Sequence, residues 1–308
     1  MADTRLHWGA EALWAQLQSL LPGISVEIAA SLPSTNSTLL ERARAGSGSS
    51  GAAAATASDA LVRRSVESGA FGRRAVDWQP CLLVAEQQTA GRGRLGREWF
   101  AEPLASLTFS LAMPLAPVDW SGLSLVVGVV LAEALDPLVD GGAPKIGIKW
   151  PNDLWLLDAD SEHGPGRKLG GILIETLSSG VKRLAVTGIG INISRPPPLR
   201  TFKASSGFAC LQEIEPSANA PDTLARVALP LVQGMQDFER AGFAHFASRF
   251  AMRDLLLDRV VTTTHADAAT GIARGVAFDG SLIVETSRGR ISLHSGEVSV
   301  RPRPEAAC

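Results

Sequence analysis

The chain has 308 residues, enough for one large domain and a small one, with 45% apolar and 19% charged residues. Its formal net charge of −2 supplies no general attraction to nucleic acid or to an anionic membrane, so neither partner is expected. The three cysteines (Cys81, Cys210 and Cys308) are widely spaced, which excludes a disulfide framework and a CxxC metal site and indicates a reducing compartment, the cytoplasm. The sequence shows no signal peptide and no apolar run long enough to span a membrane.

The first half of the chain predicts helices and strands in alternation. Residues 10–22 have the apolar spacing of a helix, and residues 25–46 predict a strand, a turn at Pro33–Asn36 and a helix with capping residues at its entry. Residues 46–59 are low in complexity, so we expect a flexible insertion over 46–79. The next expected elements are a buried strand over 81–87, a strand over 105–113 and a buried helix over 121–138.

The second half predicts a sheet, a helical stretch and then a different kind of domain. Strands are expected over 144–150, 153–157, 168–177 and 181–193, followed by a largely helical region over 221–257 that breaks near Gly242. Residues 259–301 form short strands joined by Gly, Asp and Ser turns, which is typical of a small β-barrel. We therefore predict an α+β catalytic domain over 1–255, with a mixed sheet and packed helices, and a C-terminal barrel domain over 256–308.

The segment GRGRLGR at 91–97 is strongly cationic. It matches the dinucleotide pattern GxGxxG, but that pattern opens a helix directly, and here the chain leads toward a strand. Arg92, Arg94 and Arg97 instead indicate a mobile flap that closes over a polyanion through bidentate hydrogen bonds. A solvated basic turn is the alternative interpretation.

A second motif, KWPND, begins with Lys149 at the predicted end of a strand. Pro151 bends the chain away from the sheet, so the lysine is expected to point into a pocket from a fixed backbone, where it suits a carboxylate or a charge developing on phosphorus. The alternative is turn chemistry with a solvated lysine. Two strands also carry glycines, at Gly170–Gly171 and in GIGIN (188–192). These indicate either close approach of a ligand or another backbone, or a bulge or tight packing.

Taken in order, the segments STN, EQQTAGRGRLGREW, KWPNDLW, KLGGILIE, GIGIN and SGEVSVR resemble the biotin–protein ligase family over residues 24–303. The resemblance implies a mixed sheet with packed helices, of the class II synthetase and biotin ligase kind, followed by an SH3-like β-barrel. It also implies an ATP-dependent enzyme that makes biotinyl-5′-AMP, with Mg²⁺ carried by the ATP phosphates and no dedicated metal site. Biotin would then pass to a lysine of a biotin carboxyl carrier protein.

The resemblance also implies the site residues. Lys149, Arg94 and Arg92 would be catalytic. The biotin site would comprise Ser34, Thr35, Asn36, Gln88, Gly91, Arg92, Gly93, Arg94, Lys149 and Gly171, and the ATP site Arg94, Trp99, Asn152, Asn192 and Arg301.

Two other functions stay open from the sequence. A lipoate or octanoate ligase or transferase shares a related fold but generally lacks the combination of GRGRxGR and KWPND. A biotin-responsive DNA regulator would need an N-terminal domain of roughly 60 more residues in front, so we expect the single-function type. A sheet-to-sheet homodimer is compatible with the predicted mixed sheet.

Overall fold

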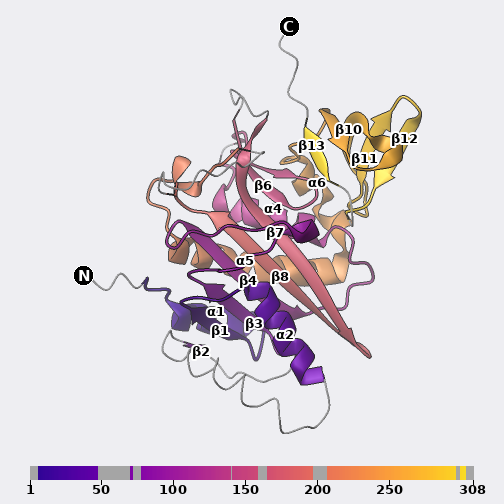
Figure 1. The fold of residues 1–308 in the computed structure, drawn as a ribbon. Coiled ribbons are helices and arrows are strands. Elements are labelled where there is room, and N and C mark those ends of the chain that lie inside the picture. Colours follow the sequence, from indigo (N-terminus) through magenta and orange to yellow (C-terminus); the bar gives the residue numbers. More distant parts are fainter. Residues whose placement is uncertain are drawn as a thin grey trace. The chain divides into compact units, whose positions relative to one another are not determined.

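The computed structural model describes residues 6–47, 70–71, 78–139, 141–158, 165–196, 207–295 and 299–302 (Figure 1). The predicted insertion at 46–79 lies almost wholly outside these residues. The chain divides into two compact units, unit 1 (1–116, 173–196 and 215–232) and unit 2 (117–172, 197–214 and 233–308). In the described part of the chain, no helix is both long and apolar enough to cross a membrane. The predicted domain boundary near residue 256 stays a prediction.

Unit 1 is built on a mixed β-sheet with strand order β2-β1-β3-β4-β8-β7. Strand β1 runs parallel to β3, whereas β3 with β4 and β4 with β8 are antiparallel pairs, so the predicted mixed sheet is confirmed. The strands are β1 (Ser25–Ala29), β2 (Ala70–Phe71), β3 (Cys81–Ala85), β4 (Ser106–Pro114), β7 (Gly166–Ser179) and β8 (Lys182–Asn192). Strand β7 enters unit 1 only from Leu173 onward.

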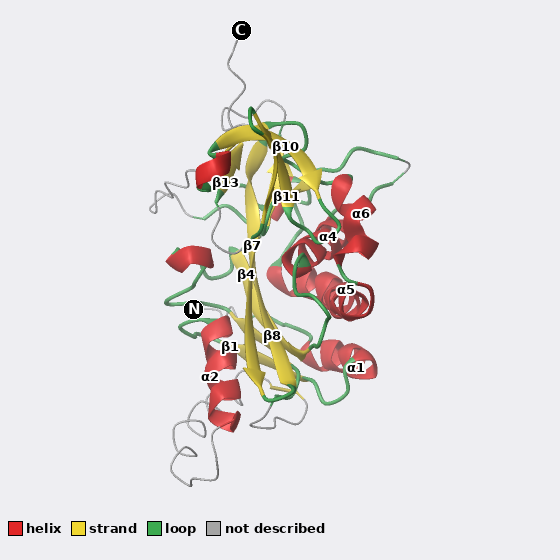
Figure 2. Ribbon diagram, turned by 90° about the vertical axis from the view of Figure 1, so that its right-hand side faces the viewer, coloured by secondary structure: helices red, strands yellow, loops and turns green. Residues whose placement is uncertain are grey.

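The helices of unit 1 cover both faces of this sheet (Figure 2). Helix α1 (Ala10–Leu20) and helix α2 (Thr35–Ser47) lie on opposite faces, and the first part of α5 (Ala220–Ala241) also belongs to this unit. Apolar residues of α2 pack on alternate residues of the strands, in a core that includes Leu39, Leu40, Leu83, Ala85, Val186 and Leu184. This packing presents the first turn of α2 to the middle of β4 and β8.

The dinucleotide-binding interpretation of residues 91–97 is excluded by the connection that follows. The Arg/Gly loop joins β3 to β4, and these strands are antiparallel neighbours. A dinucleotide fold would need a helix directly after the glycines and a parallel strand after that helix. Here only a short 3₁₀ turn at Arg94–Gly96 precedes β4.

Unit 2 contains the strands β7-β6-β5, several helical segments and a small sheet. Strands β5 (Ile146–Lys149) and β6 (Asp153–Leu157) are the segments predicted around KWPND, and the Trp150–Pro151 peptide bond between them is cis. Helix α4 (Leu123–Leu135) packs on β5 closely enough that a Cβ at Gly128 would lie 3.3 Å from Ile148. The end of α5, a 3₁₀ turn (Phe243–Phe246) and α6 (Ala247–Ala251) complete the predicted helical stretch, which breaks at Gly242.

The C-terminal strands form a five-stranded antiparallel sheet of order β12-β11-β10-β9-β13. Its strands are β9 (Val260–Thr263), β10 (Thr270–Val276), β11 (Leu282–Thr286), β12 (Gly289–Leu293) and β13 (Val300–Pro302). Among the described residues β12 and β13 are its edges, so the predicted barrel is seen as an open sheet. The turn before β11 is tied to the KWPND segment, because Trp150 Nε1 donates to the carbonyl of Gly280 at 3.0 Å.

A buried carboxyl group gives unit 2 a specific dependence on pH. Asp254 is mostly buried, and its Oδ2 has no hydrogen-bond partner in the described part of the chain, although Oδ1 accepts from Leu256 N–H at 2.9 Å. Burial raises the pKa of Asp254 from 3.8 to about 6. Between these two pH values the unfolded chain loses its proton first, so ionisation of Asp254 lowers the free energy of unfolding as pH rises.

We therefore expect Asp254→Asn to become more stable relative to the parent chain as pH rises from 4 to 6. The pH-dependent part of the difference, counted from pH well below 4, should level off above pH 7 at about 3 kcal/mol, since a shift of one pKa unit corresponds to about 1.4 kcal/mol. Urea unfolding of both proteins at several pH values between 4 and 8 measures this difference. A difference that does not change with pH would contradict the role given to Asp254.

Candidate functional site

Three predicted site residues lie at the start of α2. The backbone N–H of Ser37 donates to Ser34 Oγ at 3.4 Å, an N-cap arrangement that satisfies a donor of the first helical turn. Ser34, Thr35 and Asn36 each have only 3% of their surface exposed. Polar groups so deeply buried need partners, and these come from strands distant in the sequence.

A chain of hydrogen bonds, here called the polar chain, joins Gln88, Thr35, Ser110, Asn36 and Glu175. The backbone N–H of Thr35 donates to Gln88 Oε1 at 2.7 Å, and Thr35 Oγ1 lies 2.6 Å from Ser110 Oγ. Ser110 donates to Asn36 Oδ1 at 2.6 Å, since an amide oxygen only accepts, and Asn36 Nδ2 donates to Glu175 Oε2 at 2.9 Å. The polar chain thus links α2 to β4 and β7.

The Arg/Gly loop folds back on itself and reaches the end of the polar chain. Gly93 N–H donates to the carbonyl of Arg97 at 2.7 Å, and Trp99 N–H donates to the carbonyl of Gly91 at 2.9 Å. Arg92 Nη2 contacts both carboxylate oxygens of Glu175, at 2.9 and 3.2 Å. The motif around Asn36 and the arginine loop therefore meet at one carboxylate of β7.

Three glycines are required by close packing around these residues. A Cβ at Gly91 would lie 2.3 Å from the Trp99 carbonyl oxygen, and one at Gly190 would lie 2.3 Å from the Trp99 indole. A Cβ at Gly188 would lie 2.4 Å from Asn36 Oδ1. Of the two interpretations of GIGIN, close packing by neighbouring side chains is the one observed.

We expect Gly188→Ala to lower the free energy of unfolding by about 1–3 kcal/mol, as overpacking does. The added methyl group must push Asn36 away from Ser110. In a double-mutant cycle with Asn36→Ala, the double variant should lose less than the sum of the two single losses, because Asn36→Ala removes the clash. Strictly additive losses would contradict the contact.

A second group of predicted residues lies in unit 2, where β5, β6 and β7 pair. Lys149 stands opposite Asp153 in the sheet, and Asp153 stands opposite Gly171. The Asp153 carboxylate lies 3.8 Å from Lys149 Nζ and 2.7 Å from Lys168 Nζ. Asn152 Nδ2 donates to the carbonyl of Ile172 at 2.8 Å, beside Gly171. Lys149 is 9% exposed, so the alternative of a solvated lysine is wrong.

The remaining predicted residues are not joined to either group by these contacts. Arg94 is half-buried in the loop, and Asn192, 8% exposed, pairs with Ser106 between β8 and β4. Arg301 is exposed on β13, opposite Thr262. Their roles toward a nucleotide stay predictions. The described residues contain no cluster of three His, Cys, Asp or Glu side chains that would hold a metal ion.

Comparison with known proteins identifies the family. Residues 78–192 match the model of the biotin/lipoate A/B protein ligase family, and residues 259–301 match the biotin protein ligase C-terminal domain. The chain belongs to the biotin/lipoate A/B protein ligase family. The small antiparallel sheet of unit 2 coincides with the second match.

Relatives in this family carry ligase names. The chain is 37% identical over 222 residues to the bifunctional ligase/repressor BirA of Salmonella typhimurium, covering 71% of this chain and 66% of the relative. It spans 65% of the corresponding Escherichia coli protein, at 36% identity. A biotin–[acetyl-CoA-carboxylase] ligase of Mycobacterium tuberculosis is 28% identical, with 70% of this chain and 77% of that protein covered.

A solved structure supports the fold. The biotin protein ligase of Aquifex aeolicus, in complex with biotin and ATP, matches 90% of this chain and 99% of its own, with a TM-score of 0.64 and 24% identity. At that identity the match shows the ligase-family fold, with a mixed sheet, packed helices and a small C-terminal sheet domain.

Two residues of the polar chain escaped the sequence analysis. Ser110 is a fully buried hydroxyl between Phe109 and Leu111 of β4, and Glu175 is a charge at the end of the apolar run GILIE. A polar residue that interrupts a buried strand needs a partner, which is the signal that could have found both. Which partner it has depends on strand pairing.

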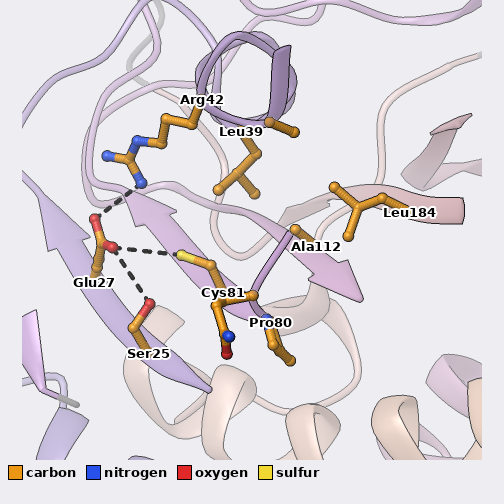
Figure 3. A pocket seen from close by; sticks show the side chains of 10 residues that line it. Ser25, Glu27, Leu39, Arg42, Pro80, Cys81, Ala112 and Leu184 are labelled. Carbon is orange, nitrogen blue, oxygen red and sulfur yellow. Dashed lines mark hydrogen bonds and ion pairs between the residues drawn. The ribbon is translucent and has the colours of Figure 1, made fainter. Parts of the chain in front are cut away.

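Unit 1 holds another polar cluster, under the second half of α2 (Figure 3). Glu27 on β1 is 1% exposed, and its carboxylate accepts from Arg42 at 3.0 Å, Ser25 at 3.4 Å and Cys81 at 3.5 Å. Burial, reinforced by the negative charge of Glu27, raises the pKa of Cys81 to about 12. The thiol therefore stays protonated and is no nucleophile. The cluster anchors α2 on the sheet, beside Leu39, Ala112 and Leu184.

Proposed function

We propose that the chain is a biotin–protein ligase, which activates biotin with MgATP and transfers it to a lysine of a biotin carboxyl carrier protein. The observation that carries the proposal is the convergence of three separate motifs on the polar chain and Arg92. The segments STN, EQQTAGRGRLGREW and KLGGILIE meet there through Asn36, Arg92 and Glu175, as expected of residues that serve one substrate. The names of the relatives and the matched C-terminal domain support biotin as that substrate.

In the first half-reaction the biotin carboxylate attacks the α-phosphorus of ATP and pyrophosphate leaves. Attack of an anion on a polyanion needs charge neutralisation and alignment more than proton transfer. Lys149, Arg92 and Arg94 supply positive charge for this step in the proposal. Mg²⁺ enters with the ATP phosphates as part of the substrate.

In the second half-reaction the amine of the carrier lysine attacks the acyl carbon of biotinyl-5′-AMP. An amide bond forms, AMP leaves with the bonding electrons of the anhydride, and the amine loses a proton. In this proposal a closed Arg/Gly loop protects the adenylate from water until the carrier arrives.

Exchange of labelled pyrophosphate into ATP tests the activation step directly. We expect exchange with biotin and little with lipoate or octanoate, because the C-terminal match is to biotin protein ligases. Exchange that depends on lipoate or octanoate instead would support the second activity covered by the family model. No exchange with any of the three acids would contradict the proposal as a whole.

Partner and location are parts of the same proposal. The carrier is a biotin carboxyl carrier protein, in line with the acetyl-CoA-carboxylase named for the relative from M. tuberculosis. Cys81 and Cys210 are free and buried thiols, which supports a reducing cytoplasm. A homodimer and the lack of DNA binding are tested by sedimentation and by a gel-shift assay.

A further inference from the structure

We infer that Glu175 is a positioning residue of the substrate site, which holds Arg92 and Asn36 in place with one carboxylate. The inference rests on the proposed function, because Arg92 and Asn36 are residues assigned there to biotin. It gives a role to Glu175, the last residue of the motif KLGGILIE, to which the sequence assigned none.

Glu175 joins the first turn of α2 to the arginine-bearing part of the β3–β4 loop, beyond the bond of Thr35 to Gln88 at the start of that loop. Its Oε2 accepts from Asn36 Nδ2 at 2.9 Å and from Arg92 Nη2 at 2.9 Å, and Oε1 lies 3.2 Å from the same Arg92 nitrogen. Asn36 belongs to the first turn of α2, and Arg92 belongs to the loop between β3 and β4. The carboxylate on β7 is therefore a second link between the helix and the loop, and it is the link that holds Arg92.

The polar chain makes the position of Glu175 specific. Asn36 cannot turn its amide away from Glu175 without breaking its bond to Ser110, whose hydroxyl lies 2.6 Å from Asn36 Oδ1. Gly188 leaves no space behind it, since a Cβ there would lie 2.4 Å from that oxygen. Asn36 therefore fixes the orientation of the Glu175 carboxylate from the buried side. The same carboxylate then holds Arg92, which lies on the solvent side.

The exposure of the Arg92–Glu175 ion pair indicates that it positions the loop and adds little to the stability of the fold. The side chains of Arg92 and Glu175 are 44% and 28% exposed. Ion pairs at such sites contribute little to the free energy of unfolding, so the fold does not depend on this one. Its effect is local: it neutralises one of three arginines that lie within six residues and tethers a loop whose tip, at Leu95 and Gly96, has positive φ.

We expect Glu175→Gln to change the KM for biotin without changing kcat or the melting temperature to a similar extent. Glutamine keeps an acceptor for Asn36 but loses the charge that holds Arg92. The loop should become easier to open, the KM for biotin should rise by about two- to fivefold and kcat should change by less than about twofold, as expected for a partly exposed ion pair. The melting temperature should stay unchanged.

Trypsin provides a readout that needs no activity, because the loop contains Arg92, Arg94 and Arg97. Cleavage after Arg94 and Arg97 in the folded chain without biotin should accelerate by about two- to fivefold in Glu175→Gln, in proportion to the loss of the tether. Glu41→Gln is the matched control, since Glu41 is an exposed carboxylate of α2 that is remote from the cleaved bonds. It should leave both the cleavage rate and the KM unchanged.

A cycle with Arg92→Gln decides whether Glu175 acts through Arg92. In that background Glu175→Gln should add nothing to the cleavage rate or to the KM. Equal cleavage of Glu175→Gln and the parent chain overturns the inference, and so does a KM effect that persists in the Arg92→Gln background. If pyrophosphate exchange itself fails, the proposed function fails, while the trypsin result still tests the tether.

Discussion

Lys149→Ala is expected to lower the rate of biotin-dependent pyrophosphate exchange by about 10²- to 10³-fold, the usual loss when one preorganised stabilising group is removed. Lys149 ends β5 with 9% of its surface exposed, and its Nζ lies 5.6 Å from the centroid of the Trp155 ring. An ammonium group held in a fixed, poorly hydrated position stabilises charge on phosphorus more strongly than a solvated one. The loss should therefore fall on the activation step.

The fold should survive this substitution, because the neighbouring charges stay balanced. Asp153 keeps Lys168 at 2.7 Å after Lys149 is removed. Lys145→Ala is the control, since Lys145 precedes the same strand but is exposed. Circular dichroism establishes folding, and exchange rates are compared at saturating biotin and ATP. Near-normal exchange by a folded Lys149→Ala protein would remove Lys149 from the mechanism.

Arg253→Met is expected to produce the largest loss of stability, about 3–5 kcal/mol, because it breaks a buried ion pair and leaves its partner in place. Arg253 is 2% exposed and joins two elements of unit 2. Its Nη1 donates to Asp136 Oδ2 and to the Ile146 carbonyl, both at 2.9 Å, and Nη2 donates to the Asp136 carbonyl at 2.5 Å. The C-terminal end of α4 and the start of β5 are thus held by one guanidinium group.

Arg249→Met provides the matched comparison in the preceding turn of the chain. Arg249 pairs with Glu133, also on α4, but both side chains are about one-third exposed, at 33% and 31%. Its loss should cost about 1 kcal/mol or less, as for other surface pairs. Urea unfolding of the two variants measures the difference, and equal losses would show that burial of Arg253 is not what makes its contacts valuable.

The sequence by itself determined the order and kind of most elements. Alternation and apolar spacing predicted the strands around Lys149, the buried helix α4 and the break at Gly242, because these signals depend on neighbours within a few residues. Motif order also predicted the ligase family. The Arg/Gly loop was correctly separated from a dinucleotide site, because the residues after it predicted a strand where that site needs a helix.

Only the tertiary structure decided which side chains meet. Ser110 and Glu175 lie 74 and 139 residues from Asn36, and no local pattern encodes a contact over such a separation. The pairing of β4 and β8, and the position of α2 on that face, bring these groups within hydrogen-bonding distance. The C-terminal sheet is open among the described residues, and the sequence could not show this, because turn spacing predicts short strands but not whether the two edge strands pair.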